Sequence, residues 1–244
     1  MISIMPSINR PVPMPAWKRA VDVVCCLAAL PIFALLTLAM TIVMKIASRG
    51  PVFFRQERVG YRDRRFMCYK FRTMVVDADS KIHQRHCDDL IRSNAPMVKM
   101  DSRRDARIIP GGWLLRASGL DELPQLINVL RGDMSLVGPR PEVRRYVEMF
   151  PDDYRVILQV RPGITDLASI KYRDEAAILG NADDPENEYI HRILPEKIRL
   201  AGEYVQRQSL WLDLTIILGT FCVVLADSMR PSSKARAGGG SSCP

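Results

Sequence analysis

Residues 23–44 form the longest stretch of the chain without a charged side chain. A helix that crosses a membrane needs about 20 apolar residues, so this run is long enough to anchor the protein in a bilayer. A buried core helix of this length would normally carry a polar stripe. A cleaved signal peptide would be shorter and would end in a small-residue cleavage site. Pro31 lies inside the run, and an interior proline typically kinks or breaks a helix.

Basic residues flank the apolar run on both sides. Three of them precede it, and a larger set follows it: Lys45, Arg49, Arg55, Arg58, Arg62, Arg64, Arg65, Lys70 and Arg72. Because lysine and arginine favour the cytoplasmic side, both ends of the run should lie on that side. We therefore expect a re-entrant helix hairpin that bends at Pro31. A full span, oriented by the heavier second cluster, is the alternative.

The remaining pattern predicts an α+β domain that is mainly helical. Residues 52–59 and 66–74 are rich in aromatic and β-branched positions and flank a polar turn at 60–65, which predicts a short antiparallel β-hairpin. Amphipathic or apolar helical patterns follow at residues 77–92, 123–130, 143–150, 188–208 (interrupted near Pro195) and 209–226. We expect a flexible arm at 1–16, an anchor at 17–47, a cytosolic domain at 48–228 and a disordered tail at 229–244.

Charge and cysteine content narrow the range of partners. The 244 residues carry a formal net charge of +8, which favours an anionic partner: nucleic acid, anionic lipid or a phosphorylated substrate. None of the six cysteines forms a C-x-x-C motif, so we expect reduced, buried thiols in a cytosolic setting. The spacing of His83, His86 and Cys87 resembles part of a metal site, but a fourth ligand is not evident.

The acidic pair Asp121-Glu122 precedes or opens the helix predicted at residues 123–130. Acidic residues are favoured at helix starts by the helix dipole, and Ser118-x-x-Asp121 fits a capping box, so a purely structural role is one interpretation. The neighbouring loops favour chemistry. Arg140 lies between Pro139 and Pro141, which restrict its backbone, and a guanidinium fixed in this way suits two-point binding of a phosphate.

Five stretches, taken in order, resemble the bacterial sugar transferases, the monotopic polyprenyl-phosphate phosphoglycosyl transferases. The similarity extends from about residue 18 to residue 226. The stretches are Lys18-Arg19-x-x-Asp22; Gly50-Pro51-Val52-Phe53-Phe54-Arg55-Gln56-Glu57-Arg58-Val59-Gly60; Tyr69-Lys70-Phe71-Arg72-Thr73-Met74; Asp121-Glu122-Leu123-Pro124-Gln125-Leu126-Ile127-Asn128-Val129 with residues 132–142; and Arg161-Pro162-Gly163-Ile164-Thr165.

The resemblance implies a two-step transfer at the bacterial inner membrane, with the catalytic domain facing the cytoplasm. Asp121 would attack the donor UDP-sugar, release UMP and hold the sugar phosphate covalently. Polyprenyl phosphate, such as undecaprenyl phosphate, would then accept it, in the first membrane step of exopolysaccharide, O-antigen or glycoconjugate synthesis. Glu122 would be the partner of Asp121, and both would hold Mg²⁺. The implied substrate-binding residues are Arg58, Lys70, Arg72, Pro139, Arg140, Pro141, Glu142 and Arg161.

Two departures from the family pattern stand out. Leu30 precedes Pro31 where members often have serine, and Asp166-Leu167-Ala168-Ser169-Ile170 replaces a common Gly-Leu-Ala-Gln-Val. The resemblance implies a membrane-lipid partner and no nucleic acid, and it leaves a homodimer open. The main alternative is a membrane-attached basic module that binds anionic lipid or nucleic acid without catalysis. A two-carboxylate glycosidase is disfavoured because adjacent residues rarely place carboxyls across a glycosidic bond.

Overall fold

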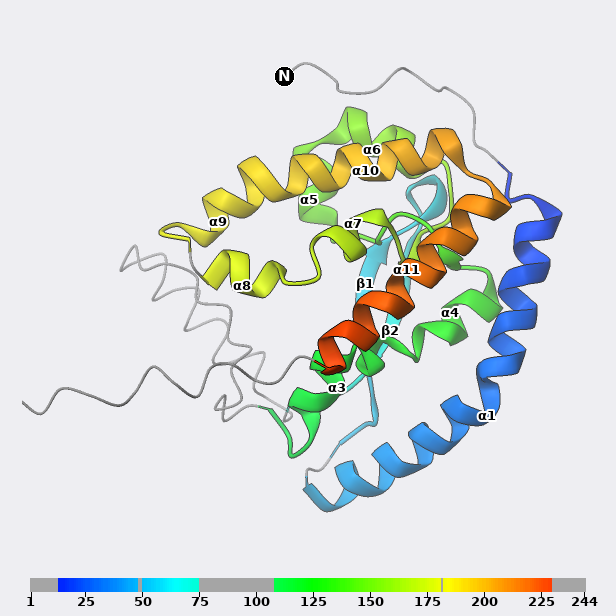
Figure 1. Ribbon diagram of the computed structural model, residues 1–244, viewed down its shortest axis with the longest axis vertical. Helices are drawn as coiled ribbons and strands as arrows, with labels where there is room; N and C mark the ends of the chain where they lie inside the picture. Colours follow the sequence, from blue (N-terminus) through cyan, green and yellow to red (C-terminus); the bar gives the residue numbers. More distant parts are fainter. Residues whose placement is uncertain (1–12, 48–49, 75–107, 181, 230–244) are drawn as a thin grey trace, which may run out of the picture.

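The computed structural model describes residues 13–47, 50–74, 108–180 and 182–229. These residues are mainly helical and include a two-stranded antiparallel hairpin, which confirms the α+β prediction (Figure 1). The helices are α1 (Ala16–Ala47), α3 (Gly112–Ser118), α4 (Gln125–Arg131), α5 (Arg144–Met149), α6 (Pro151–Ile157), α7 (Leu167–Lys171), α8 (Glu175–Gly180), α9 (Pro185–Glu188), α10 (Leu194–Arg207) and α11 (Leu210–Met229).

The antiparallel hairpin consists of β1 (Phe53–Val59) and β2 (Arg65–Phe71), as the sequence predicted. The two strands pair over their full length, from Phe53 opposite Phe71 to Val59 opposite Arg65. From Arg65 to Cys68 the more and less exposed side chains alternate with the period of two of a β-strand, and Cys68 is buried against Leu126 and Val129 of α4. Phe71, at the end of β2, is also buried, whereas Phe54 of β1 is exposed.

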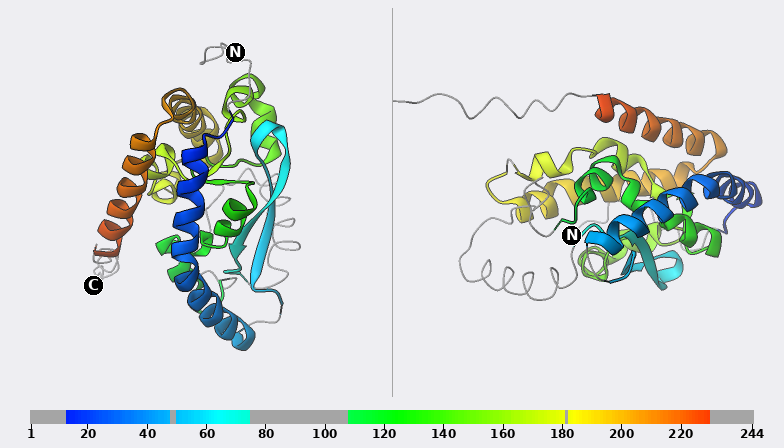
Figure 2. Two further views of the ribbon diagram at one scale, coloured as in Figure 1. Left: turned by 90° about the vertical axis from the view of Figure 1, so that its right-hand side faces the viewer. Right: turned by 90° about the horizontal axis from the view of Figure 1, so that it is seen from below.

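Helix α1 is one continuous helix that contains Pro31. Among the described residues it is the one helix long and apolar enough to cross a membrane: an 18-residue window within Ala16–Ile46 has a mean hydropathy of 2.6, and 11% of that window is buried. Figures 1 and 2 show that α1 changes direction partway along its length. An interior proline is a common cause of such a bend. The predicted return of the chain to the same membrane face stays a prediction.

Polar side chains fix the first turns of α1 to the rest of the domain. The Arg19 guanidinium donates to the carbonyl oxygens of Val129 (2.6 Å) and Leu130 (2.8 Å), at the C-terminal end of α4. Asp22 accepts from the Leu136 N–H at 2.9 Å. Lys18 is buried, pairs with Asp213 and donates to the Tyr204 hydroxyl. The anchor is therefore held to both α4 and the C-terminal helices.

A parallel strand pair lies at the centre of the domain. Strand β3 (Ser135–Val137) pairs with β4 (Gly163–Thr165), two segments in which the sequence analysis predicted no strand. The backbones pass so closely that a Cβ on Gly138 would lie 2.5 Å from the Arg161 carbonyl oxygen. A Cβ on Gly163 would lie 2.1 Å from the Gly138 nitrogen. Glycine is therefore required at both positions.

Helices of the C-terminal third pack over this strand pair, and α11 contacts both β3 and β4. The helix predicted at residues 188–208 begins earlier, at α9, passes through a π-helical turn (Tyr189–Ile193) and continues as α10, with Pro195 in the first turn of α10. Helix α11 packs Ile216 against Val137 and Tyr204. Its opposite side leaves large apolar side chains exposed: Leu210, Trp211, Leu214, Leu218, Phe221 and Leu225.

Two of the four cysteines that the structure describes are buried. The cysteines were expected to be buried, which is correct for Cys26 and Cys68 but wrong for Cys25 and Cys222, because these two lie on the outer faces of α1 and α11. The helix predicted at residues 77–92, which includes the His83, His86 and Cys87 group, lies outside the described residues.

Candidate active site

Asp121 and Glu122 lie in a single 3₁₀ turn (Leu120–Glu122) between α3 and α4. Gly119, with φ at 75°, ends α3 and turns the chain into this segment. The expected capping box is wrong: the Ser118 hydroxyl donates back to the Leu114 carbonyl at 2.8 Å instead of capping the helix that follows. The acidic pair therefore precedes α4 and is not part of its first turn.

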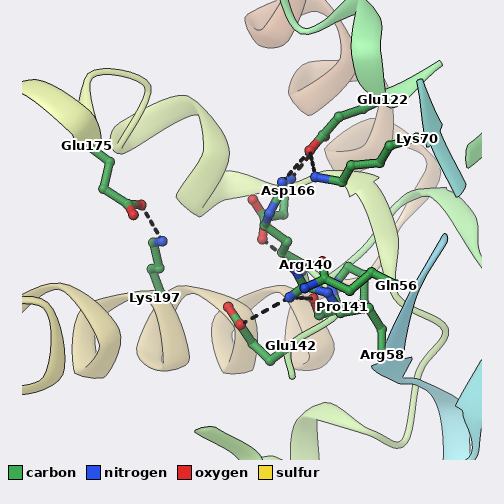
Figure 3. Close-up of polar contacts among 10 residues, drawn as sticks. All are labelled: Gln56, Arg58, Lys70, Glu122, Arg140, Pro141, Glu142, Asp166, Glu175 and Lys197. Carbon is green, nitrogen blue, oxygen red and sulfur yellow. Dashed lines mark hydrogen bonds and ion pairs between the residues drawn. The ribbon is translucent and has the colours of Figure 1, made fainter. Parts of the chain in front are cut away.

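Glu122 is held by two cations from different parts of the chain. The Lys70 ammonium, from β2, donates to Glu122 Oε1 at 2.7 Å. The Arg140 guanidinium reaches both carboxylate oxygens, with Nη1 3.2 Å from Oε2 and Nη2 on Oε1 (Figure 3). Burial alone would raise the pKa of Glu122, but Arg140 and Lys70 outweigh it and hold this pKa well below its usual range. Glu122 is thus an ionised, fixed carboxylate at neutral pH.

The partners and the pKa of Asp121 differ from those of Glu122. Within the part of the chain that the structure describes, its carboxylate has no hydrogen bond or ion pair. Burial, together with the neighbouring charge of Glu122, raises the pKa of Asp121 to about 6, against the opposing effects of Lys70, Arg116 and Arg140. Two adjacent carboxylates therefore differ in both partner and pKa, a pattern typical of catalytic sites.

The loop that carries Arg140 is held from the side of the β-hairpin. Arg58 donates to the Pro141 carbonyl oxygen at 3.1 Å, and the Val59 N–H donates to the Glu142 carbonyl oxygen at 3.0 Å. These contacts fix the backbone on both sides of the Pro141–Glu142 bond. Arg58, which the sequence analysis assigned to substrate binding, supports the Arg140 loop in this structure. A direct contact of Arg58 with substrate stays a prediction.

A second group of charged side chains lies beside the loop (Figure 3). Glu142 is 3.7 Å from the Arg58 guanidinium, and burial raises the pKa of Glu142 despite the positive charges of Arg58 and Lys197. Lys197, on α10, pairs with Glu175 on α8. The sequence analysis missed Lys197, which lies in an ordinary amphipathic helix pattern, and Glu175, which lies in a segment with no predicted element. Only the tertiary fold brings them near Glu142.

The other sequence-predicted residues lie at different distances from this site. Arg72 is buried just after β2, two residues beyond Lys70. Arg161 lies at the other end of the hairpin, over the ring of Tyr61 and 3.0 Å from the Met14 sulfur. There it lines a cavity of about 240 Å³, separate from the Lys70–Glu122–Arg140 group. Arg161 therefore does not lie beside the acidic pair, and its role in substrate binding stays a prediction.

A divalent metal would find few protein ligands here. Among the described residues, no group of three or more His, Cys, Asp or Glu side chains is placed to hold a metal ion. Mg²⁺ is commonly bound by one or two carboxylates, with the remaining ligands supplied by water and substrate phosphates. The Asp121-Glu122 pair fits that pattern, because the Asp121 oxygens are available and oxygen is the ligand type that Mg²⁺ prefers.

Comparisons with known proteins point to one family. The family model described as bacterial sugar transferase matches residues 14–227. Similar proteins include a UDP-glucose:undecaprenyl-phosphate glucose-1-phosphate transferase of Caulobacter vibrioides, 37% identical over 206 residues that cover 83% of this chain and 67% of that protein. An undecaprenyl-phosphate N-acetylgalactosaminephosphotransferase of Aeromonas hydrophila is 36% identical, over 85% of this chain and 43% of the relative.

Some relatives are of similar length and others are much longer. Exopolysaccharide production protein ExoY of Rhizobium meliloti is 34% identical over 85% of this chain and 84% of its own length. The chain spans less than half of the Aeromonas relative. The family model nevertheless covers the anchor, the hairpin, the acidic pair and both arginine-proline loops. The chain belongs to the bacterial sugar transferase family.

Proposed function

We propose that the protein is a phosphoglycosyl transferase that moves a sugar 1-phosphate from a UDP-sugar to undecaprenyl or another polyprenyl phosphate. The observation that carries this proposal is the unequal acidic pair: Glu122 is fixed by two cations, whereas the adjacent Asp121 has no such partner. The names of the relatives supply the acceptor, undecaprenyl phosphate, and the reaction class.

In the first step, a carboxylate oxygen of Asp121 attacks the phosphorus that bears the sugar. A bond forms between that oxygen and phosphorus, the bond from this phosphorus to the bridging oxygen breaks, and UMP leaves with the electron pair. In the second step, an oxygen of the polyprenyl phosphate attacks the same phosphorus and Asp121 is released as a carboxylate. Splitting the transfer allows a water-soluble donor and a lipid acceptor to use one site in turn.

Charge is the main obstacle to this chemistry, because an anionic nucleophile approaches an anionic diphosphate. Lys70 and Arg140 lie on Glu122 and can reorient toward the donor phosphates, which compete for the same guanidinium and ammonium groups. The side chains of the site are half-buried, so water screens these charges less than it would at the open surface and each of them acts more strongly there.

Mg²⁺ fits this site as a cofactor that Asp121 and Glu122 would hold. When bound, it would supply further neutralisation of the phosphate charge. The residues of the chain then have separate tasks. Asp121 reacts, Glu122 orients the cations, and Arg140 with Lys70 binds the phosphates.

The anchor places this site at the membrane surface. We infer that α1 enters the bilayer, bends at Pro31 and returns, so that both flanking basic segments face the cytoplasm of a bacterial inner membrane. The apolar exposure of α1 supports insertion. Single cysteines placed just before and just after α1, labelled from each side of sealed inner-membrane vesicles, test this topology; labels on opposite faces would establish a full span instead.

Substitution of Asp121 by asparagine tests the mechanism. The purified protein is mixed with UDP-sugar, polyprenyl phosphate and Mg²⁺, and UMP is measured. Asp121→Asn should lower UMP release by at least about 1,000-fold, because an amide is a poor nucleophile, while membrane association is kept. Asp152→Asn is a matched control, since Asp152 is exposed and, among the residues that the structure describes, pairs only with Arg155 on its own helix. Unchanged turnover in Asp121→Asn would refute the mechanism.

Intact-mass spectrometry tests the covalent step independently. Without acceptor, the wild-type protein should gain the mass of one sugar phosphate, and Asp121→Asn should not. Because the relatives are named for glucose, galactose and N-acetylgalactosamine, a panel of UDP-sugars is the appropriate donor set. Release of free sugar instead of lipid-linked product would favour a glycosidase.

A further inference from the structure

Asp166 is a buried carboxylate that contacts two different segments. It follows β4, and 4% of the residue is exposed. One oxygen, Oδ1, accepts from the Ser169 N–H at 2.6 Å and caps α7. The other, Oδ2, accepts from the backbone N–H of Arg140 at 3.0 Å (Figure 3). We propose that Asp166 is a positioning residue that fixes the backbone of Arg140 and thereby directs its guanidinium to Glu122 and to the donor phosphates.

The sequence around Arg140 explains why this contact matters. Proline has no backbone N–H, so Arg140 supplies the only backbone donor among three consecutive residues, Pro139, Arg140 and Pro141. Two residues earlier, the Gly138 N–H donates to the Thr165 carbonyl oxygen at 3.1 Å. N–H groups two residues apart point to the same side of an extended chain. The Asp166 side chain therefore extends the hydrogen bonding of the β3–β4 pair by one further step.

The Asp166 carboxylate also adds charge at this point. The positive charge of Arg140 is stabilised first by Glu122 and then by Asp166 and Glu142, which together raise the pKa of the Arg140 guanidinium. Asp166 thus acts on Arg140 through both a backbone hydrogen bond and a nearby negative charge. Its two oxygens are already used within the protein, so a positioning role is more consistent with the geometry than direct contact with substrate.

Position 166 is one of the places where this chain departs from the family pattern, in which glycine is common. Glycine could make neither hydrogen bond. Through Asp166 the Arg140 loop is connected to α7, which packs on α11. Thr165, on the preceding strand β4, contacts Thr220 of α11 at 2.6 Å.

The test compares substitutions at Asp166 with the loss of an unrelated helix cap. This inference rests on the proposed function, so kcat and KM for the UDP-sugar are measured by UMP release, together with thermal stability. Asp166→Gly and Asp166→Ala should lower kcat/KM by about 10- to 100-fold, mainly through a higher KM, because a misplaced guanidinium binds the donor poorly. Asp166→Asn keeps one acceptor oxygen and should lie between them and the wild type.

Asp184→Ala is the matched control. Asp184 caps α9 by accepting from the Asn187 N–H at 3.0 Å, on an exposed surface. This variant should lose stability through the same kind of contact but keep the wild-type KM. A role for Asp166 that is only structural predicts the same result for Asp166→Gly: lower stability and an unchanged donor KM. That outcome would overturn the proposal.

A double-mutant cycle gives a second readout. In an Arg140→Ala background, Asp166→Ala should cause little further loss of kcat/KM, because the group that Asp166 positions is gone. Additive losses would contradict a positioning role. The two proposals fail in different ways: absence of UMP release by the wild-type protein refutes the function, whereas wild-type turnover with a normal KM in Asp166→Gly refutes only the role of Asp166.

Discussion

The charge of Lys70 should set the pH at which the enzyme becomes active. Asp121 reacts as a carboxylate, so donor turnover should rise with pH through a midpoint of about 6, its raised pKa. The Lys70 charge lowers this pKa, because a nearby cation stabilises the ionised form. Lys70→Met removes that stabilisation while Arg140 keeps Glu122 ionised. The pKa of Asp121, and with it the rising limb of the profile, should therefore move to higher pH.

The size of the shift follows from the position of Lys70. Two unit charges about 4 Å apart interact by about 4 kcal/mol at an effective dielectric constant of ~20, and one pKa unit corresponds to about 1.36 kcal/mol. Lys70 bonds to Glu122 and not to Asp121, and 21% of its side chain is exposed, so distance and solvent weaken the effect. We expect a shift of about one unit, to a midpoint near pH 7. Lys70→Arg should stay near 6.

The assay is the pH dependence of kcat/KM for UMP release at fixed Mg²⁺. The midpoint pH of this profile does not depend on the absolute rate, so a variant with lower activity still reports the pKa of Asp121. Arg116→Gln should move the midpoint in the same direction by a smaller amount, because Arg116 also lowers the pKa of Asp121. A Lys70→Met midpoint at or below that of the wild type would refute the assignment of this ionisation to Asp121.

Other predictions concern stability and metal. Gly138→Ala should prevent folding or lower the melting temperature strongly, because its Cβ would overlap the neighbouring backbone, whereas Gly180→Ala, which meets no atom within 4 Å, should not. Lys18→Met should cost about 3–5 kcal/mol of unfolding free energy by leaving Asp213 buried and unpaired, and Lys18→Met with Asp213→Leu should recover most of it; chemical denaturation in detergent measures both. Chelation with EDTA should stop UMP release, and added Mg²⁺ should restore it.

The sequence predicted the elements that depend on local pattern. The hairpin followed from two segments rich in aromatic and β-branched residues around a polar turn, and the anchor from an uncharged run. The acidic pair and the Arg140 loop were found from motif order, and the structure brings Lys70, Glu122 and Arg140 together. These are short-range or motif-based signals, which a single sequence carries.

Tertiary contacts account for what the sequence analysis missed. The strand pair β3–β4 is only three residues long on each side, too short for a periodic signal, and it forms because two glycines permit close approach. Ser118 fitted a capping box by spacing, but the turn at Gly119 directs it back to α3. Arg161 resembled Arg140 in its proline context, yet the fold places it at the far end of the hairpin, over Tyr61.

The close approach of Gly138 and Gly163 has a consequence for chimeric enzymes. Since neither backbone can move without the other, the segment with Arg140 and the segment with Asp166 form one exchangeable unit, although more than twenty residues separate them in sequence. If residues 132–142 were grafted from a relative that has glycine in place of Asp166, the grafted loop would come from a protein in which no carboxylate at that position accepts the backbone N–H of the arginine. Domain exchange aimed at new donor sugars should therefore transfer residues 132–142 and 161–171 together.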